Sequence, residues 1–454
     1  MSFDRLTSLD ASFLEVESEN AHMHVGWGAL FAAPRDRARP SFEKLRGHVE
    51  SRLSRAPRYR QKLAEVPLGV HHPVWVDDPD FDIGRHVMRS AFSDWDELVD
   101  MVMSTQLDRA RPLWELWIAD SLGDGRIGVV GKAHHCMVDG LAAVELAAML
   151  LDPTPEPPNP GGDDWQPQRA PGRLALLAQG VLDIGGSALE LGSFPLRVAR
   201  HPTRLGGLAQ EGARTVRAVA RSVQPATPET PFNEPISPQR HLARARRPLE
   251  DLKRITHRFG TSINDVVLAA AAGGVRRLLE RHGETPVGLK TMVPVSVRGH
   301  NGGGRLGNQV SFVFIELPCD EPDPIRRLRD VKLAMTERKR GGEPEGADTV
   351  LKAFGYAPVA VQHVVSRMVA SPRAFNLVVS NIPGPREPLY MLGCELEEVY
   401  PVVPIADRHG VAIGVTTIKD QSFFGVYADR ESLPDADVIA QGMDESIEEL
   451  LALT

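Results

Sequence analysis

The sequence predicts a mixed α/β (α+β) protein made of two units of a similar kind. Its 454 residues are too many for one ordinary hydrophobic core. Both halves combine helical patterns with β-like runs that are joined by hairpin turns. Pro-rich stretches separate the halves. We therefore divide the chain into a first unit (1–152), a connecting region (153–239) and a second unit (240–454).

The composition is typical of a folded cytoplasmic protein. The chain is 42% apolar and 25% charged, and its formal net charge of -8 argues against nucleic acid as a partner. Three cysteines without CxxC spacing indicate a reducing compartment and no disulfide framework. The acidic start lacks the apolar stretch of a signal peptide. No apolar run reaches the roughly 18 residues that span a bilayer, so we expect any membrane contact to be peripheral.

In the first unit, the sequence predicts a helix followed by a hairpin. The helix covers Phe42 to Ser54, with Ser41 as its N-cap. The hairpin strands cover Leu113 to Leu122 and Arg126 to His134, and an Asp-Gly pair lies in the turn between them. A second helix is expected from Leu141 to Leu150.

The connecting region has two kinds of composition. Proline is frequent from Asp152 to Arg173 and again from Gln224 to Pro238, which is typical of linkers. Between them, Leu174 to Val223 has helical periodicity and more arginines than acids. Such a segment suits either a membrane surface or a solvated pair of helices that bridges the two units.

The second unit is predicted to contain four helices and five strands. Thr261 to Asp265 offers N-cap residues for one of the helices. The expected helices are Leu249 to Arg258, Val266 to Leu279, Pro324 to Arg340 and Asp348 to Val369, the last broken near Pro358. The expected strands are Leu289 to Val297, Gln309 to Leu317, Phe375 to Ser380, Val411 to Ile418 and Phe423 to Tyr427, the last two forming a hairpin.

The stretch from Lys132 to Gly140 carries the chemistry. His134 and His135 end the predicted strand, Asp139 follows four residues after His135, and Gly140 lets substrate or backbone approach closely. A neutral imidazole is a good general base near pH 7. His135 is the better candidate base. His134 is expected to point the other way and to line or brace the site, and Asp139 either orients His135 or pairs with a distant arginine.

Other interpretations of this stretch remain open. Two histidines and an aspartate could bind a metal, but adjacent histidines at a strand end diverge and no further ligand stands at a recognised spacing. Cys136 could be a thiol nucleophile, although a small buried apolar role fits its position better. The two histidines could also be core residues without chemistry. We predict no metal and no cofactor.

The His-His-x-x-x-Asp-Gly string is similar to that of CoA-dependent acyltransferases and peptide-synthetase condensation domains. Further motifs narrow the resemblance to the bacterial wax ester synthase/acyl-CoA:diacylglycerol acyltransferase family and spread over nearly the whole chain. They are Leu9 to Phe13, Met23 to Gly26, Pro112 to Trp114, Asn264 to Leu268, Pro294 to Arg298, Gly307 to Ser311 and Ser380 to Pro385.

This resemblance implies two chloramphenicol-acetyltransferase-like lobes with a central tunnel. It implies that His135 is the general base, with acyl-CoA entering from one face and the acceptor alcohol from the other. The motif aspartate, Asp139, is expected to be structural, and Arg298 is our candidate for its partner. Further substrate-binding or structural candidates are Gly140, Asn264, Asp265, Ser380 and Asn381, of which Asn264 could stabilise the oxyanion.

The resemblance predicts an O-acyltransferase that moves a long acyl chain from acyl-CoA to a lipid alcohol. Diacylglycerol as acceptor would give triacylglycerol, and a fatty alcohol would give a wax ester. The Arg-, Ala- and Gly-rich composition favours the first. Two alternatives stay open: a condensation-type enzyme that uses a carrier-protein thioester, and a non-catalytic lipid-binding protein. We expect it in the cytoplasm, with peripheral contact to the inner membrane face or lipid droplets. The sequence leaves the oligomeric state open.

Overall fold

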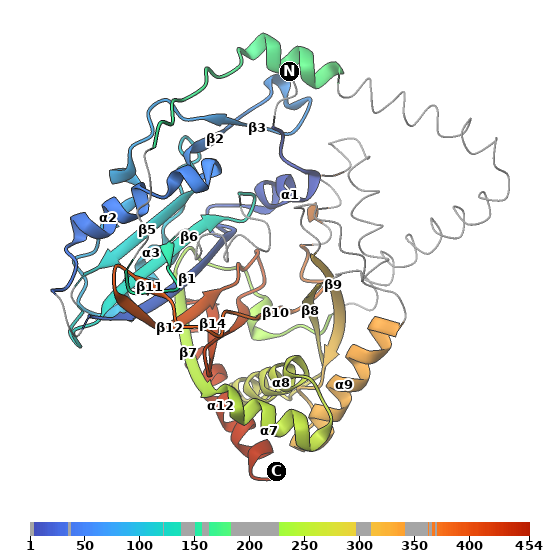
Figure 1. Ribbon diagram of the computed structural model, residues 1–454. Coiled ribbons are helices and arrows are strands. Elements are labelled where there is room, and N and C mark those ends of the chain that lie inside the picture. The colour runs from blue at the N-terminus through green and yellow to red at the C-terminus, as the bar shows by residue number, and fades with distance from the viewer. Residues whose placement is uncertain are drawn as a thin grey trace, which may run out of the picture.

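The computed structural model describes residues 4–34, 38–120, 122–137, 150–156, 163–182, 227–296, 310–340, 362, 366–367 and 370–454. These residues form two six-stranded sheets, a two-stranded sheet and the helices that cover them (Figure 1). The predicted helix Leu141 to Leu150 lies outside the described residues except for Leu150. The predicted helix Asp348 to Val369 and the part of the connecting region after residue 182 also fall mostly outside them.

The first sheet has the strand order β11-β12-β1-β6-β5-β4. Its strands are β1 (His24–Ala32), β4 (Val87–Arg89), β5 (Trp114–Ala119), β6 (Ile127–His134), β11 (Tyr390–Met391) and β12 (Cys394–Val402). The antiparallel hairpin β5–β6 confirms the predicted pair of strands, with Gly125 at φ +84° in its turn. Strands β11 and β12 come from the second half of the chain. The first sheet therefore needs residues on both sides of the connecting region.

Glycines let helix α3 (Trp95–Ser104) lie close to the first sheet. A Cβ at Gly28 would come within 2.5 Å of the Trp95 ring, and a Cβ at Gly26 would meet the Met103 side chain equally closely. Large side chains of α3 fill the space that the glycines leave. This helix thereby covers the sheet face that carries His24 and His134, which are paired neighbours on β1 and β6.

The remaining elements of the first half surround this sheet. Helix α1 (Ser8–Val16) lies near the end of β6, and helix α2 (Phe42–Glu50) starts at Ser41, whose side chain caps it as predicted. Strands β2 (Gln61–Ala64) and β3 (Val74–Asp77) form the small sheet. Short 3-10 turns cover Leu53–Arg55, Pro57–Arg60, Pro67–Gly69 and Ile83–Arg85.

The second sheet has the order β7-β14-β13-β10-β8-β9. Its strands are β7 (Arg240–Pro248), β8 (Leu289–Ser296), β9 (Val310–Leu317), β10 (Leu377–Ile382), β13 (Val411–Ile418) and β14 (Gln421–Asp429). The covering helices are α7 (Leu249–Phe259), α8 (Ile263–Arg281), α9 (Pro324–Arg340) and α12 (Asp437–Leu451). The all-apolar middle of α8 is buried between this sheet and α12, as its sequence Val266 to Gly274 requires.

The sequence located most of these elements but missed several. The predicted strands at Leu289, Gln309, Phe375 and Val411 correspond to β8, β9, β10 and β13 within one or two residues at most ends. Helix α8 begins three residues earlier than predicted, because Ser262 and Asp265 form a capping box. The elements that were not predicted are helices α1, α3 and α12 and strands β1, β2, β3, β4, β7, β11 and β12. The β-strands among them alternate only weakly, and β7 is rich in arginine.

Strand β12 is also where the two sheets meet. Its Pro401 packs against β13, where a Cβ on Gly414 would lie 3.0 Å from the Pro401 carbonyl oxygen. Glu398 of β12 is buried and accepts hydrogen bonds from Arg126 (2.9 Å), Arg246 (3.0 Å) and the Tyr400 hydroxyl (2.7 Å). A buried carboxylate needs such partners. The arginines come from the β5–β6 hairpin and from β7, so this carboxylate ties the halves together.

A second link between the halves centres on His241 of β7. Its Nδ1 lies 2.9 Å from Asp100 of α3, and its Nε2 lies 3.0 Å from Asp437 at the start of α12. Arg430 also pairs with Asp100 at 3.2 Å. Hydrogen bonding to Asp100, opposed by burial, raises the pKa of His241 to about 8. The charged imidazolium is therefore the form that joins these two helices.

We predict that stability falls as the pH rises through about 8. The folded-state pKa lies above the ordinary 6.5, so the contribution of His241 is complete below pH 6.5 and is lost above pH 8. Its size is on the order of 1–2 kcal/mol. Thermal unfolding of His241→Gln and of the unchanged protein should differ at pH 6 and converge at pH 9. His257→Gln, an exposed histidine on α7, is the control. An equal difference at both pH values would contradict the prediction.

Candidate active site

The two histidines lie where β6 ends. His134 is the last residue of the strand, and His135 begins the turn that follows. The backbone N–H of His135 donates to the Met23 carbonyl (2.9 Å), and Met23 has φ +48°, an uncommon value for a residue with a side chain. The motif residues before β1 thus hold the backbone of the His-His turn. Local strain of this kind is frequent at functional sites.

His134 is fully buried and shapes the turn. Its Nδ1 accepts a hydrogen bond from the backbone N–H of Cys136 (3.1 Å). In the neutral ring the proton therefore lies on Nε2, which faces Glu17 Oε2 at 3.6 Å. This hydrogen bond from the backbone two residues ahead fixes the turn around His135. The role of His134 in the reaction stays a prediction.

Glu17, just after α1, is the anionic partner of this histidine. Its side chain is 2% exposed, pairs with Arg109 and accepts a hydrogen bond from Gln106 (2.9 Å). Burial alone would raise the pKa of Glu17, but the contacts with His134, Gln106 and Arg109 outweigh it and lower the pKa to about 2. Glu17 is therefore a carboxylate at every physiological pH.

Arg109 joins the same group to helix α1. Its guanidinium pairs with Glu17 and also donates to the Leu14 carbonyl (3.1 Å). The backbone N–H of Glu17 in turn caps α1 by donating to the Phe13 carbonyl. These contacts hold the last turn of α1 in place beside the two histidines.

His135 lies against that turn of α1. Its ring stacks on the Phe13 ring, with centroids 3.7 Å apart and planes 14° apart. The ring Nδ1 is buried and makes no hydrogen bond of ordinary geometry with a described residue. Burial lowers the pKa of His135 to about 4, because imidazolium loses its hydration there. The ring is thus neutral near pH 7, which is the state that a general base needs.

A buried lysine joins strand β6 to the end of helix α3. Lys132 is fully buried on β6, and its Nζ donates to the carbonyls of Val102 (2.8 Å) and Thr105 (2.5 Å) and pairs with Glu115 at 3.2 Å. The two carbonyls end helix α3, where a cation is favourable. Lys132 therefore fixes α3 to the strand two residues before His134.

The described residues bear on some of the competing interpretations of the motif. Cys136 is buried, and burial raises the pKa of its thiol, whereas a nucleophilic cysteine needs a lowered pKa. Within the described ranges, no three His, Cys, Asp or Glu side chains converge as metal ligands would. His135 is partly exposed, and its buried Nδ1 makes no hydrogen bond with a described residue, unlike the ring of a satisfied core histidine.

The other predicted site residues divide into two groups. Asp139, Gly140 and Arg298 lie outside the described residues. Asn264 and Asp265 lie in the first turn of α8, where Asp265 belongs to the capping box, and Ser380 and Asn381 lie near the end of β10. Within the described part, none of these four forms a hydrogen bond with either histidine. Asp265 is thus structural, and the role of the other three stays a prediction.

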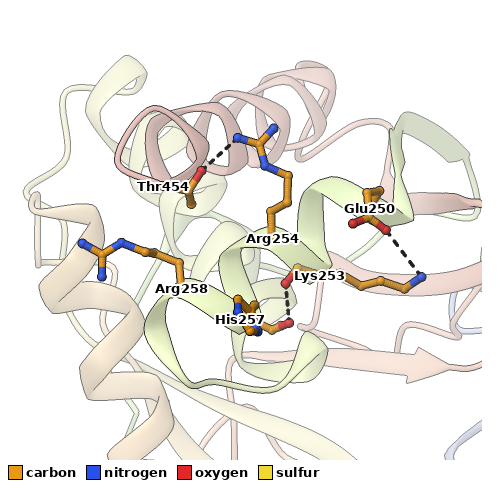
Figure 2. Close-up of a pocket in the computed structure, with 7 residues that line it drawn as sticks. Glu250, Lys253, Arg254, His257, Arg258 and Thr454 are labelled. Carbon is orange, nitrogen blue, oxygen red and sulfur yellow. Dashed lines mark hydrogen bonds and ion pairs between the residues drawn. The ribbon is translucent and has the colours of Figure 1, made fainter.

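A hollow in the surface lies elsewhere, on the outer side of α7 beside the C-terminus (Figure 2). Arg254 donates to the Thr454 hydroxyl there at 3.2 Å, and Lys253 pairs with Glu250 at 3.7 Å. Its lining residues come from α7 and Thr454. None of them surrounds His135, so the hollow is no part of this site.

Comparison with known families agrees with this geometry. The model of the wax ester synthase/diacylglycerol acyltransferase catalytic domain matches residues 6–267, and that of the C-terminal domain of the same family matches residues 306–451. The chain belongs to the wax ester synthase/diacylglycerol acyltransferase family. It is accordingly an acyltransferase, and the first of the two matches includes both histidines and Glu17.

Individual relatives span nearly the whole chain. A probable diacylglycerol O-acyltransferase of Mycobacterium tuberculosis is 31% identical over 99% of this chain and 96% of its own length. A second, putative one from that organism is 33% identical over 99% of this chain and 90% of its own length.

Solved structures share the fold. The wax ester synthase/diacylglycerol acyltransferase of Marinobacter aquaeolei VT8 matches with a TM-score of 0.69, 24% identity and 98% coverage of both chains. The starter condensation domain of rhizomide synthetase matches with a TM-score of 0.57 at 12% identity, covering 99% of this chain and 94% of its own. The predicted two-lobed fold is thereby confirmed.

Sequence reasoning found the two histidines but missed their partners. Glu17, Arg109, Phe13 and Met23 were not singled out, although Phe13 and Met23 belong to motifs of the resemblance. The available signal was the spacing of Phe13 and Glu17, four residues apart at the end of a helix. Nothing in the sequence places that helix beside β6, because the contact joins segments more than 100 residues apart.

We predict that Glu17→Gln slows acyl transfer about 10- to 100-fold while the protein stays folded. The amide keeps the size of the side chain but removes the charge that holds His134 and Arg109, so His135 loses its fixed orientation. Release of CoA thiol measures the rate, and the exposed Glu19→Gln is the matched control. A Glu17→Gln rate equal to that of the control would contradict the role assigned to this carboxylate.

Proposed function

We propose that this acyltransferase transfers a long acyl chain from acyl-CoA to the hydroxyl of diacylglycerol, giving triacylglycerol. The single observation that carries the proposal is a neutral, partly exposed His135 fixed in the turn of the family motif. The names of the mycobacterial relatives support diacylglycerol as the acceptor. A fatty alcohol, giving a wax ester, is the second acceptor that the family name suggests.

In the proposed reaction His135 is the general base. Because Nδ1 is buried, the reacting nitrogen is Nε2, which removes the proton of the acceptor hydroxyl as its oxygen attacks the thioester carbonyl. The C–S bond of the tetrahedral intermediate then breaks. The CoA thiolate leaves and takes the proton back from the imidazolium. No acyl-enzyme forms, which agrees with the buried, protonated thiol of Cys136.

Phe13 and Glu17 keep the His135 ring neutral and oriented. The Phe13 ring packs on one face of His135 and excludes water from it, which disfavours the charged imidazolium before the substrate arrives. Glu17 acts through His134 on the turn itself. Asn264 remains our candidate for stabilising the oxyanion, and Asp139 and Arg298 remain our candidate pair for holding the turn.

The protein is proposed to work at a lipid surface on the cytoplasmic side. Its three cysteines are all free and buried, which fits a reducing compartment. None of the helices within the described ranges is both long and apolar enough to cross a bilayer. Diacylglycerol is insoluble in water, so the enzyme is proposed to meet it by lying on the membrane or on a lipid droplet.

We predict that His135→Ala lowers the rate of thiol release from acyl-CoA and diacylglycerol about 100- to 10,000-fold, the usual contribution of a general base. The exposed His282→Ala is the control, since it removes an imidazole far along the chain. Circular dichroism checks the fold. A folded His135→Ala variant with the control's rate would refute the mechanism. Thiol release only from a carrier-bound thioester, or from no donor, would refute the proposed function.

The pH dependence gives an independent test of His135. Its pKa of about 4 means that the free enzyme keeps a neutral base from pH 8 down to about pH 5. Thus kcat/KM should stay flat between pH 8 and pH 6 and fall only as the pH approaches 4. Measurements run within the pH range in which circular dichroism shows a folded protein. An acidic limb centred near 6.5 would mean that an ordinary, exposed histidine controls the rate instead.

A further inference from the structure

The helix at residues 173–182 is apolar on both of its faces. On the inner face, Leu176 is buried with Val74 and Val76 of β3. On the outer face, Leu174 is 83% exposed, Leu182 68% and Val181 55%. Ala175 and Ala178 are exposed beside them, and at 100° per residue the five side chains fall within an arc of about 120°. A helix on a protein surface normally turns polar side chains to water.

The neighbouring turn adds one more exposed leucine. The turn Pro67–Gly69 packs on this helix, since a Cβ on Gly180 would lie 3.2 Å from Val66 and 3.3 Å from Val70. At its tip Leu68 is 88% exposed and has φ +64°, a conformation unfavourable for leucine. Four of the eight large apolar side chains that are exposed in the described part thus belong to this helix and turn. We call Leu68, Leu174, Ala175, Ala178, Val181 and Leu182 the apolar corner.

The apolar corner connects to the candidate active site through backbone contacts. Strand β3 lies under the helix and receives the first described residues of the chain, with Trp75 N–H donating to the Asp4 carbonyl at 2.7 Å. That segment runs directly into α1, whose Phe13 stacks on His135. Figure 1 shows the helix, in green near the N-terminus, above β2 and β3.

The size and charge of the apolar corner indicate which kind of partner it binds. A stable protein interface covers roughly 800 Å² on each side, more than six side chains of which two are alanines can offer to a second copy. Arg173 is the one charged residue of the helix, so the corner has no charge pattern for a specific protein partner. An apolar helix face of this kind fits the boundary between the headgroups and the acyl chains of a bilayer, where binding needs neither a complementary shape nor complementary charges.

We propose that the apolar corner is the surface by which this acyltransferase lies on a phospholipid bilayer, with its leucines inserted among the acyl chains. This inference rests on the proposed function, because that function supplies an acceptor dissolved in the bilayer. It explains why a leucine occupies the left-handed tip of an exposed turn and why the helix has an apolar outer face.

The test measures binding of the full chain to phosphatidylcholine vesicles by flotation. Leu174→Glu should lower the partition coefficient at least tenfold, since full burial of a leucine is worth more than one factor of ten. Leu68→Asn should lower it several-fold, and because asparagine tolerates the left-handed conformation we expect this variant to keep the fold of the turn. Leu333→Glu on α9, a leucine that is 52% exposed and lies outside the apolar corner, should bind as the unchanged protein does.

Activity without vesicles separates this inference from the proposed function. With a short, water-soluble alcohol as acceptor, all three variants should release CoA thiol at the unchanged rate. If the unchanged protein released no thiol from any acceptor, the proposed function would fail while vesicle binding would still be measured.

The proposal is overturned if the unchanged protein does not bind the vesicles. It is equally overturned if Leu68→Asn and Leu174→Glu bind as Leu333→Glu does. Binding only to anionic vesicles, abolished by salt, would place the contact on basic residues elsewhere in the chain and would also overturn it.

Discussion

The structure of the site depends on one buried imidazole held from both sides. His134 accepts a hydrogen bond from the Cys136 backbone at Nδ1 and presents Nε2 to the Glu17 carboxylate. Rotating the ring would break the Nδ1 hydrogen bond and leave the buried N–H of Cys136 unpaired, which costs more than the hydrogen bond itself gains. The turn that follows is therefore rigid, and the contacts of His134 fix the position of His135.

The electrostatics of the two histidines then separate their roles. His134 faces a carboxylate that stays ionised, whereas His135 faces an aromatic ring and no described acid. Burial penalises a positive charge on the His135 ring. Two identical side chains in adjacent positions thus receive opposite environments, because a strand end directs them to opposite sides. The same division makes one a structural group and the other a suitable base.

The sequence predicted the features that depend on neighbouring residues and missed those that depend on contacts between distant segments. The β5–β6 hairpin, the cap of α2 and the buried helix α8 are local patterns of polarity and capping, and the sequence predicted all three. The His-His turn was recognised for the same reason. Glu17 and Arg109 were missed because their contacts with His134 depend on how α1 packs on a sheet far along the chain. Strand β12 was missed because it joins a sheet of the other half.

The placement of β12 has a consequence for how the chain acquires its structure. Strand β1 pairs on one side with β6 and on the other with β12, which is synthesised more than 350 residues later. Until that late segment leaves the ribosome, the edge of β1 stays open, and open strand edges recruit other chains. The first sheet, which carries the histidines, therefore cannot be completed until β12 has been synthesised. We expect the nascent chain to be open to edge-to-edge pairing with other chains until β12 is synthesised.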